Sequence, residues 1–203
     1  MKKIKLNLGC GIWLRSGWIN VDNYFTLEDL KSKKGAFKNA KIDRGAEYVK
    51  ADIIKMPFPD DYADVVEMHQ VLEHIGMHRV IDVMKEVYRV TKPGGKLFVD
   101  VPSFTGLAID WLQMVTSTDF DPKKYNDVAE TIFGNQYADS EGELHRVPFT
   151  PQFMNYVLTN AGFNNGQMFI IPKGMVMPAI GELAKPLKGH VARNDILFVE
   201  ASK

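Results

Sequence analysis

The sequence of 203 residues contains a single cysteine, Cys10. One thiol excludes a disulfide within the chain and any metal site built from several thiolates, and it fits a reducing compartment. The chain also lacks a run of the roughly 20 apolar residues that a membrane span needs. Because Lys5 and Asn7 interrupt the apolar start, we expect a strand there rather than a signal peptide, and a cytoplasmic location.

The chain also has no excess of charge of either sign, since 25 lysines and arginines balance 25 aspartates and glutamates. Proteins that coat nucleic acid or an anionic membrane need a basic excess, so the sequence gives no strong nucleic-acid signal and predicts no membrane partner. A local basic patch such as Lys31–Lys34 remains open. With 45% hydrophobic and 25% charged residues, the composition is that of a globular domain with a substantial core.

Short apolar runs alternate with helical patterns along the chain, which predicts an α/β sheet. The clearest helix covers about His78–Val90, with its apolar side chains on one face, and Thr91–Gly95 is expected to end it in a turn. A strand follows directly, so this unit is a βαβ crossover with parallel strands. The expected strands are Ile4–Leu8, Trp18–Val21, Tyr48–Ala51, Asp64–Met68, Lys96–Val101, Met168–Ile171 and Ile196–Glu200.

Beyond Pro102 the pattern becomes mainly helical. Asp121-Pro122 and Thr150-Pro151 each place a capping side chain before a proline at the first helical position. No second core is evident in this region. We therefore predict that residues 1–203 form a single domain with a mainly helical insertion at about 102–150.

The most informative segment is a glycine turn followed closely by an acid. The first strand runs into Gly9-Cys10-Gly11, and the second strand ends at Asp22. Glycine lets a ligand approach the backbone, and an acid at the tip of the next strand can accept the hydroxyls of a ribose. This arrangement indicates an adenosine-containing ligand, and an ordinary tight turn between strands is the alternative interpretation.

Two common nucleotide ligands do not fit this turn. The dinucleotide fingerprint requires a third glycine where Leu14 stands, and an acid about 20 residues further on rather than at Asp22. Too little chain remains for the helix whose N-terminus would bind a pyrophosphate. A nucleoside triphosphate is disfavoured because no Gly-Lys-Ser/Thr follows the glycines.

These motifs, in their order, resemble the small class I S-adenosylmethionine-dependent methyltransferases of the type 11 group. The resemblance implies a Rossmann-like three-layer sandwich with a seven-stranded, mostly parallel sheet and an antiparallel final hairpin. It implies S-adenosyl-L-methionine as cofactor and S-adenosyl-L-homocysteine as product. The stretches that carry it are Gly9-Cys10-Gly11, Gly17–Asp22, Ala51-Asp52-Ile53, Pro57–Asp61, Ala63–Val66, Val71–Ile75, Glu86–Val90, Lys92–Gly95, His145-Arg146, Phe149–Pro151 and Ala161–Phe163.

The same resemblance implies where the cofactor binds. The glycine turn would hold the methionine part, Asp22 the ribose, and Asp52 the adenine amino group. Gln70 would face the sulfonium end, although members of the family often carry histidine there. The residues expected around the cofactor are Gly9, Cys10, Gly11, Asp22, Asn23, Asp52, Ile53 and Gln70.

Methyl transfer needs positioning and sometimes a base, but no protein nucleophile. His145 is the best candidate base, and His74 is a second candidate catalytic residue. No His-x-x-x-His spacing is present, so we predict no metal site. The expected partner is a small-molecule methyl acceptor, sugar-like or another metabolite, and the oligomeric state is not specified by the sequence.

Two alternatives remain. One is a protein that binds the cofactor without catalysis, which the glutamine at position 70 favours. The other is a nucleic-acid methyltransferase. The neutral charge argues against it, as does the lack of an Asn/Asp-Pro-Pro-Tyr-like stretch, for which Val101–Phe104 is no substitute.

Overall fold

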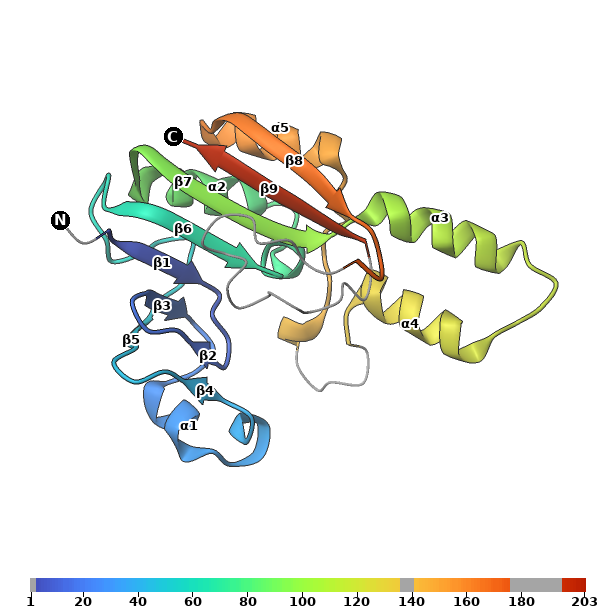
Figure 1. Cartoon of the computed structure of the whole chain (residues 1–203), viewed down its shortest axis with the longest axis horizontal. Coiled ribbons are helices and arrows are strands. Elements are labelled where there is room, and N and C mark those ends of the chain that lie inside the picture. The colour runs from blue at the N-terminus through green and yellow to red at the C-terminus, as the bar shows by residue number, and fades with distance from the viewer. Residues whose placement is uncertain (1–2, 136–140, 176–194) are drawn as a thin grey trace.

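The computed structural model describes residues 3–135, 141–175 and 195–203. In these residues the main sheet has seven strands in the order β5-β3-β1-β6-β7-β9-β8 (Figure 1). Neighbours from β5 to β7 are parallel, and β9 is antiparallel to both β7 and β8. This arrangement confirms the expected fold class. The strands are β1 (Lys5–Leu8), β3 (Ile19–Asp22), β5 (Glu47–Lys50), β6 (Ala63–His69), β7 (Thr91–Pro102), β8 (Asn164–Ile171) and β9 (Ile196–Ser202).

The start of β7 differs from the sequence expectation. Thr91 pairs with Ala63 immediately after helix α2 (Val80–Val90), and pairing resumes at Lys96 opposite Val65. The Thr91–Gly95 segment is therefore an irregular first part of the strand rather than a separate turn. Gly94, with a φ of 75°, supplies the left-handed backbone that this bulge requires.

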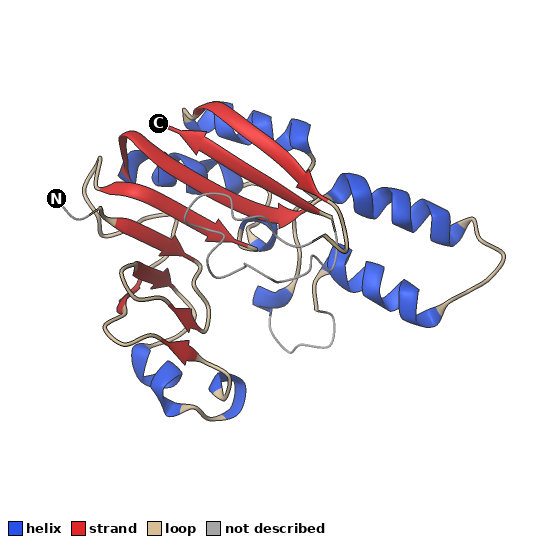
Figure 2. Cartoon of the chain, viewed as in Figure 1, coloured by secondary structure: helices blue, strands red, loops and turns tan. Residues whose placement is uncertain are grey.

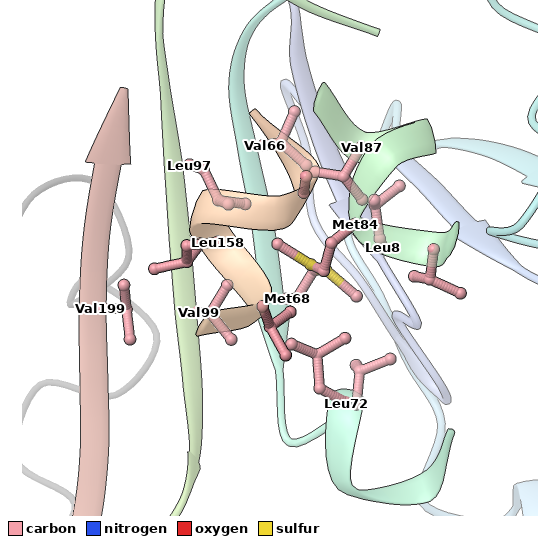
Figure 3. Close-up of a cluster of buried hydrophobic side chains, with 14 of the residues drawn as sticks. Leu8, Val66, Met68, Leu72, Met84, Val87, Leu97, Val99, Leu158 and Val199 are labelled. Carbon is pink, nitrogen blue, oxygen red and sulfur yellow. The ribbon is translucent and has the colours of Figure 1, made fainter. Parts of the chain in front are cut away.

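Helices α2 and α5 (Pro151–Ala161) pack against each other and cover one face of the sheet (Figure 2). Their apolar stripes meet the strands in the main core, where Met84, Val87 and Leu158 are at most 2% exposed. Figure 3 shows these side chains against Met68 and Leu97 from the sheet. Burying each such side chain stabilises the fold by about 1.5–3 kcal/mol. This core holds the strands whose ends carry the candidate site.

The opposite face of the sheet has a smaller apolar cluster, which includes Trp18, Val65 and Phe98. Because side chains alternate along a strand, Glu67 points to the same side as Val65, away from the main core. Glu67 is 0% exposed, so this face buries a carboxylate as well as apolar side chains.

The helical segments after β7 begin where the sequence predicts. The side chain of Asp121 caps α4 (Pro122–Phe133), and that of Thr150 caps α5. In Figure 1, α3 (Phe104–Val115) and α4 project together from the edge where β7 ends. No helix in the described part of the chain is long and apolar enough to cross a membrane.

Segments on both sides of β3 form a small lobe. Its short elements are β2 (Trp13–Leu14), α1 (Leu27–Ser32), η1 (Gly35–Phe37) and β4 (Lys41–Ile42). Strands β2 and β4 form a parallel pair, and Leu30 lies at the centre of the lobe's own apolar cluster at 0% exposure. The basic Lys31–Lys34 stretch lies on the surface of this lobe.

Candidate functional site

Four of the expected cofactor segments meet at one edge of the sheet. Strands β5, β3, β1 and β6 are mutually parallel, so their carboxyl ends lie side by side. Two backbone hydrogen bonds join these ends: Cys10 donates to the carbonyl of Val21 at 3.1 Å, and Ala51 donates to that of Asp22 at 3.0 Å. The glycine turn, Asp22 and the segment that carries Asp52 are therefore neighbours.

The Asp22 carboxylate is fixed by backbone amides on both sides. Gly11 N donates to Oδ2 and Tyr24 N to Oδ1, each at 2.9 Å, and the residue is 6% exposed. Asn23 lies between these contacts as an exposed residue. The acid is thus oriented before any ligand arrives, and each of its oxygens keeps a second lone pair for another donor.

Gly9 lies where the backbone closely approaches a neighbouring segment. Its φ is +64°, and a Cβ built there would lie 2.5 Å from Cγ2 of Val71. A side chain has no space at this position. Glycine is therefore required both for the turn and for the contact between the end of β1 and the loop after β6.

Cys10 lies in the same turn but is not poised as a nucleophile. Burial, with a contribution from Asp22, raises the pKa of its thiol to about 12, so the thiolate is scarce at neutral pH. Cys10 is therefore a small turn residue rather than a nucleophile.

Asp52 and Ile53 follow β5 on opposite sides of the chain. Ile53 is buried in the main core, whereas the side chain of Asp52 is 43% exposed. Asp52 Oδ1 accepts from Ile54 N at 3.0 Å, and Oδ2 lies 3.3 Å from Nη2 of Arg79. The carboxylate thus remains open to solvent beside the strand edge.

Gln70 occupies an unusual backbone conformation directly after β6. Its φ is +50°, in the left-handed region that non-glycine residues seldom adopt. Two hydrogen bonds to Asp100 hold it there, one from its backbone N to the carbonyl at 3.0 Å and one from Nε2 to Oδ2 at 2.8 Å. Asp100 therefore sets the position of Gln70.

Asp100 belongs to a buried charge network that sequence reasoning missed. Arg15 pairs with Glu67, and His69 hydrogen-bonds through Nδ1 to Asp100 while its Nε2 lies 3.6 Å from Glu67 Oε2. Burial opposes the charge on His69, but the hydrogen bond to Asp100 and the nearby carboxylate of Glu67 outweigh it and raise the pKa of the imidazole to about 9. In the sequence this network is indicated only by Glu67 and His69, which stand at alternate positions of a buried strand.

His74 and His145, which are predicted separately, lie together. Their rings are in edge-to-face contact with centroids 4.8 Å apart. His74 Nδ1 lies 3.1 Å from the carbonyl oxygen of Leu144, and His145 Nδ1 lies 2.7 Å from that of Thr131. Burial lowers the pKa of both imidazoles, and the nearby His145 lowers that of His74 further. Both rings are therefore neutral at pH 7.

The loop that carries His145 runs along the strand edge. A Cβ at Gly142 would lie 3.2 Å from the ring of Tyr24, close to Asp22 in sequence, and Arg146 N donates to the carbonyl of Glu73 at 2.6 Å. His145 N donates to the carbonyl of Phe133, at the end of α4, at 3.0 Å. The loop thus connects the Asp22 side of the site, the histidine pair and the projecting helices.

Comparisons with known proteins agree with this geometry. A family model described as a methyltransferase domain matches residues 6–99. A ubiquinone/menaquinone biosynthesis C-methyltransferase of Vibrio campbellii is 30% identical over 132 residues, covering 64% of this chain and 48% of that protein. The chain spans less than half the length of the curated relatives it matches.

Solved structures share the fold along nearly the whole chain. A SAM-dependent methyltransferase from Methanosarcina mazei superposes with a TM-score of 0.61 at 16% identity, covering 100% of this chain and 92% of that one. Human N-acetylserotonin methyltransferase, solved in complex with SAM, has a TM-score of 0.53 at 16% identity, with 99% and 47% coverage. Residues 6–99 thus match a methyltransferase domain, and the chain has the fold of solved SAM-dependent methyltransferases.

The raised pKa of His69 predicts a loss of stability in mild alkali. A group whose pKa rises from 6.5 to about 9 on folding stabilises the fold fully below pH 6.5, and this contribution disappears as the pH passes 9. We expect the free energy of unfolding to fall by up to about 3 kcal/mol between pH 6.5 and pH 9.5. Urea unfolding of wild type and His69→Gln measures this, with His78→Gln as the exposed control. Equal pH dependence in wild type and His69→Gln would contradict the charged network.

The contact at Gly9 predicts a steric penalty for Gly9→Ala. Left-handed backbone costs a residue with a Cβ about 1–2 kcal/mol, and the overlap with Val71 adds roughly 1–3 kcal/mol. Gly45→Ala is the matched control, because Gly45 has a φ of +77° and no atom lies within 4 Å of the position that its Cβ would take. Denaturant unfolding should show the larger loss for Gly9→Ala, partly recovered in Gly9→Ala/Val71→Ala. Equal losses for the two glycine variants would show that the close approach is absent.

Proposed function

We propose that this protein transfers a methyl group from S-adenosyl-L-methionine to a small-molecule acceptor. The observation that carries the proposal is the Gly9–Gly11 turn, whose backbone is held against the Asp22 carboxylate at an edge shared by four parallel strands. The match to a methyltransferase domain and the shared fold support S-adenosyl-L-methionine as the cofactor that this turn would bind.

In the proposed complex the turn from Gly9 to Gly11 receives the methionine part, and Asp22 accepts hydrogen bonds from the ribose. Asn23 would border the ribose, while Asp52 and the Ile53 amide would meet the adenine ring. Gln70 would face the sulfonium end, oriented by its hydrogen bond to Asp100. A buried carboxylate that is already oriented loses little freedom when it binds a diol, which favours affinity.

The chemical step is a displacement at the methyl carbon. An acceptor atom forms the new bond as the carbon–sulfur bond breaks, S-adenosyl-L-homocysteine leaves, and the acceptor gives up its proton. A carbonyl oxygen can only accept a hydrogen bond, so Nδ1 of His145 carries the ring proton and Nε2 offers a lone pair. We assign His145 as the proposed base, with His74 beside it.

The methyl acceptor is proposed to bind between the His145 loop and the α3–α4 pair. These two helices lie within the mainly helical insertion that is predicted at residues 102–150 of a single domain. The hydrogen bond between His145 and Phe133 supports this placement. A neutral chain favours a small acceptor over nucleic acid. A cytoplasmic location is part of the same proposal.

Calorimetry with S-adenosyl-L-methionine and S-adenosyl-L-homocysteine tests the cofactor assignment. We expect both to bind, and Asp22→Asn to weaken binding by roughly tenfold or more, because a charge-assisted hydrogen bond contributes about 1.5–3 kcal/mol. Asp43→Asn is the matched control, since Asp43 also accepts from a backbone amide, that of Ser16 at 3.0 Å. Failure of the wild type to bind either compound at millimolar concentration would refute the proposal.

A cofactor-binding protein without catalysis is the second candidate, favoured by a glutamine at position 70 that is tied to Asp100. Incubation with labelled cofactor and a panel of hydroxyl, amine and carbon acceptors separates the two. Methyl transfer to any acceptor supports the enzyme, whereas tight cofactor binding with no transfer across the panel supports the binding protein.

A further inference from the structure

Glu73 is a buried carboxyl group whose oxygens lack partners. The residue is 2% exposed, and neither Oε1 nor Oε2 has a hydrogen-bond partner among the described residues. An unpaired buried polar group costs about 1–3 kcal/mol, and more if it is charged. Burial raises the pKa of this carboxyl well above its usual range. Packing alone does not explain an acid at this position.

The carboxyl group faces the two histidines of the candidate site. One ligand atom each from Glu73, His74 and His145 can be chosen so that all three lie within 4.8 Å of one another. Glu73 and His74 come from the 3-10 turn η2 (Leu72–His74), and His145 comes from the loop before α5. The backbone between them is fixed, because the amides of Arg146 and Val147 both donate to the carbonyl of Glu73.

The histidines are also oriented as ligands. Each Nδ1 donates to a backbone carbonyl, that of Leu144 for His74 and that of Thr131 for His145. This leaves each Nε2 with a free lone pair and the ring held in place. Metal-ligating histidines in proteins typically have such a second hydrogen bond, which fixes both the tautomer and the ring orientation.

We propose that Glu73, His74 and His145 form a binding site for one divalent transition-metal ion of the zinc class. Two imidazole nitrogens and one carboxylate oxygen suit zinc or cobalt, whereas magnesium and calcium prefer ligand sets made of oxygen. Three protein ligands leave a fourth position open, as in catalytic zinc sites.

The dimensions and access of the cluster fit this ion. Bonds of about 2.0–2.2 Å place tetrahedral ligands about 3.3 Å apart, so a small inward movement of the side chains completes the site. Both imidazoles are half-buried and partly exposed to solvent, whereas Glu73 is buried. The exposed parts of the two imidazoles give an ion access to the cluster. On binding, Glu73 loses its proton and becomes a paired carboxylate.

The consequence for catalysis rests on the proposed function. With an ion bound, His74 and His145 are ligands rather than bases, and an acceptor oxygen at the open position would lose its proton more readily. Binding of the ion itself does not depend on methyl transfer, so the site can be tested without cofactor or acceptor.

The test is titration of chelator-treated full-length protein with Zn²⁺ by calorimetry and with Co²⁺ by visible absorption, without S-adenosyl-L-methionine. We expect one equivalent to bind with a Kd below about 10 μM and intense tetrahedral Co²⁺ bands. Glu73→Gln and His145→Gln should each weaken binding at least tenfold. Two controls should bind as wild type does: His78→Gln, which alters an exposed histidine, and Cys10→Ser, which alters the single thiol.

Thermal unfolding of each apo variant checks that it is folded. Glu73→Gln replaces a neutral acid by a neutral amide of equal size, and His145→Gln alters a half-buried side chain. If one of these variants fails to fold, the other alone tests the metal site. Absence of Zn²⁺ binding below about 1 mM, or binding that both ligand variants retain, would overturn the metal site. Cofactor calorimetry on the same metal-free protein reports on the proposed function separately.

Discussion

The hydrogen bond from Gly11 N to the Asp22 carboxylate is the interaction on which the site depends. It joins the turn after β1 to the end of β3, and it orients the acid toward the same edge as the glycine backbone. The turn can take this position only because Gly9 has no side chain where Val71 approaches. The missing side chain at Gly9 and the hydrogen bond to the Asp22 carboxylate thus fix the distance between the two groups that are proposed to bind the cofactor.

Behind this edge lies an unusual concentration of buried charge. Arg15, Glu67, His69 and Asp100 compensate one another on the face of the sheet opposite the main core. Burying them carries a desolvation cost that apolar side chains would avoid, so stability alone does not account for them. Their structural effect is at the strand ends, where Asp100 holds Gln70 in a left-handed conformation. The network therefore extends from the sheet to the proposed cofactor pocket.

The local features of the fold could be predicted from the sequence. Strand periodicity, the helix ending at Val90 and the caps at Asp121 and Thr150 depend on neighbouring residues, and all three are confirmed. The glycine turn and the acid after it are likewise close in sequence. The prediction of a turn at Thr91–Gly95 is wrong because proline and glycine can mark a bulge as well as a turn, and only pairing with Ala63 decides between them.

Contacts between distant segments could not be predicted in this way. His74 and His145 are adjacent because the loop before α5 returns to the end of β6, and no periodicity encodes that return. Glu73 stands out in the sequence only as part of the Val71–Ile75 stretch, because nothing in the sequence shows that its carboxyl group is buried near two imidazoles. The absence of a metal site stays a prediction, because it rests on ligand spacing along the chain, and spacing cannot detect a cluster that a loop closes.

The most direct measurement of the central claim is a crystal structure of the protein with S-adenosyl-L-homocysteine bound. The account predicts that both ribose hydroxyls lie within about 3.2 Å of the Asp22 carboxylate oxygens and that the amino-acid part lies against the Gly9–Gly11 backbone. A ligand bound elsewhere, or one whose ribose makes no contact with Asp22, would contradict it.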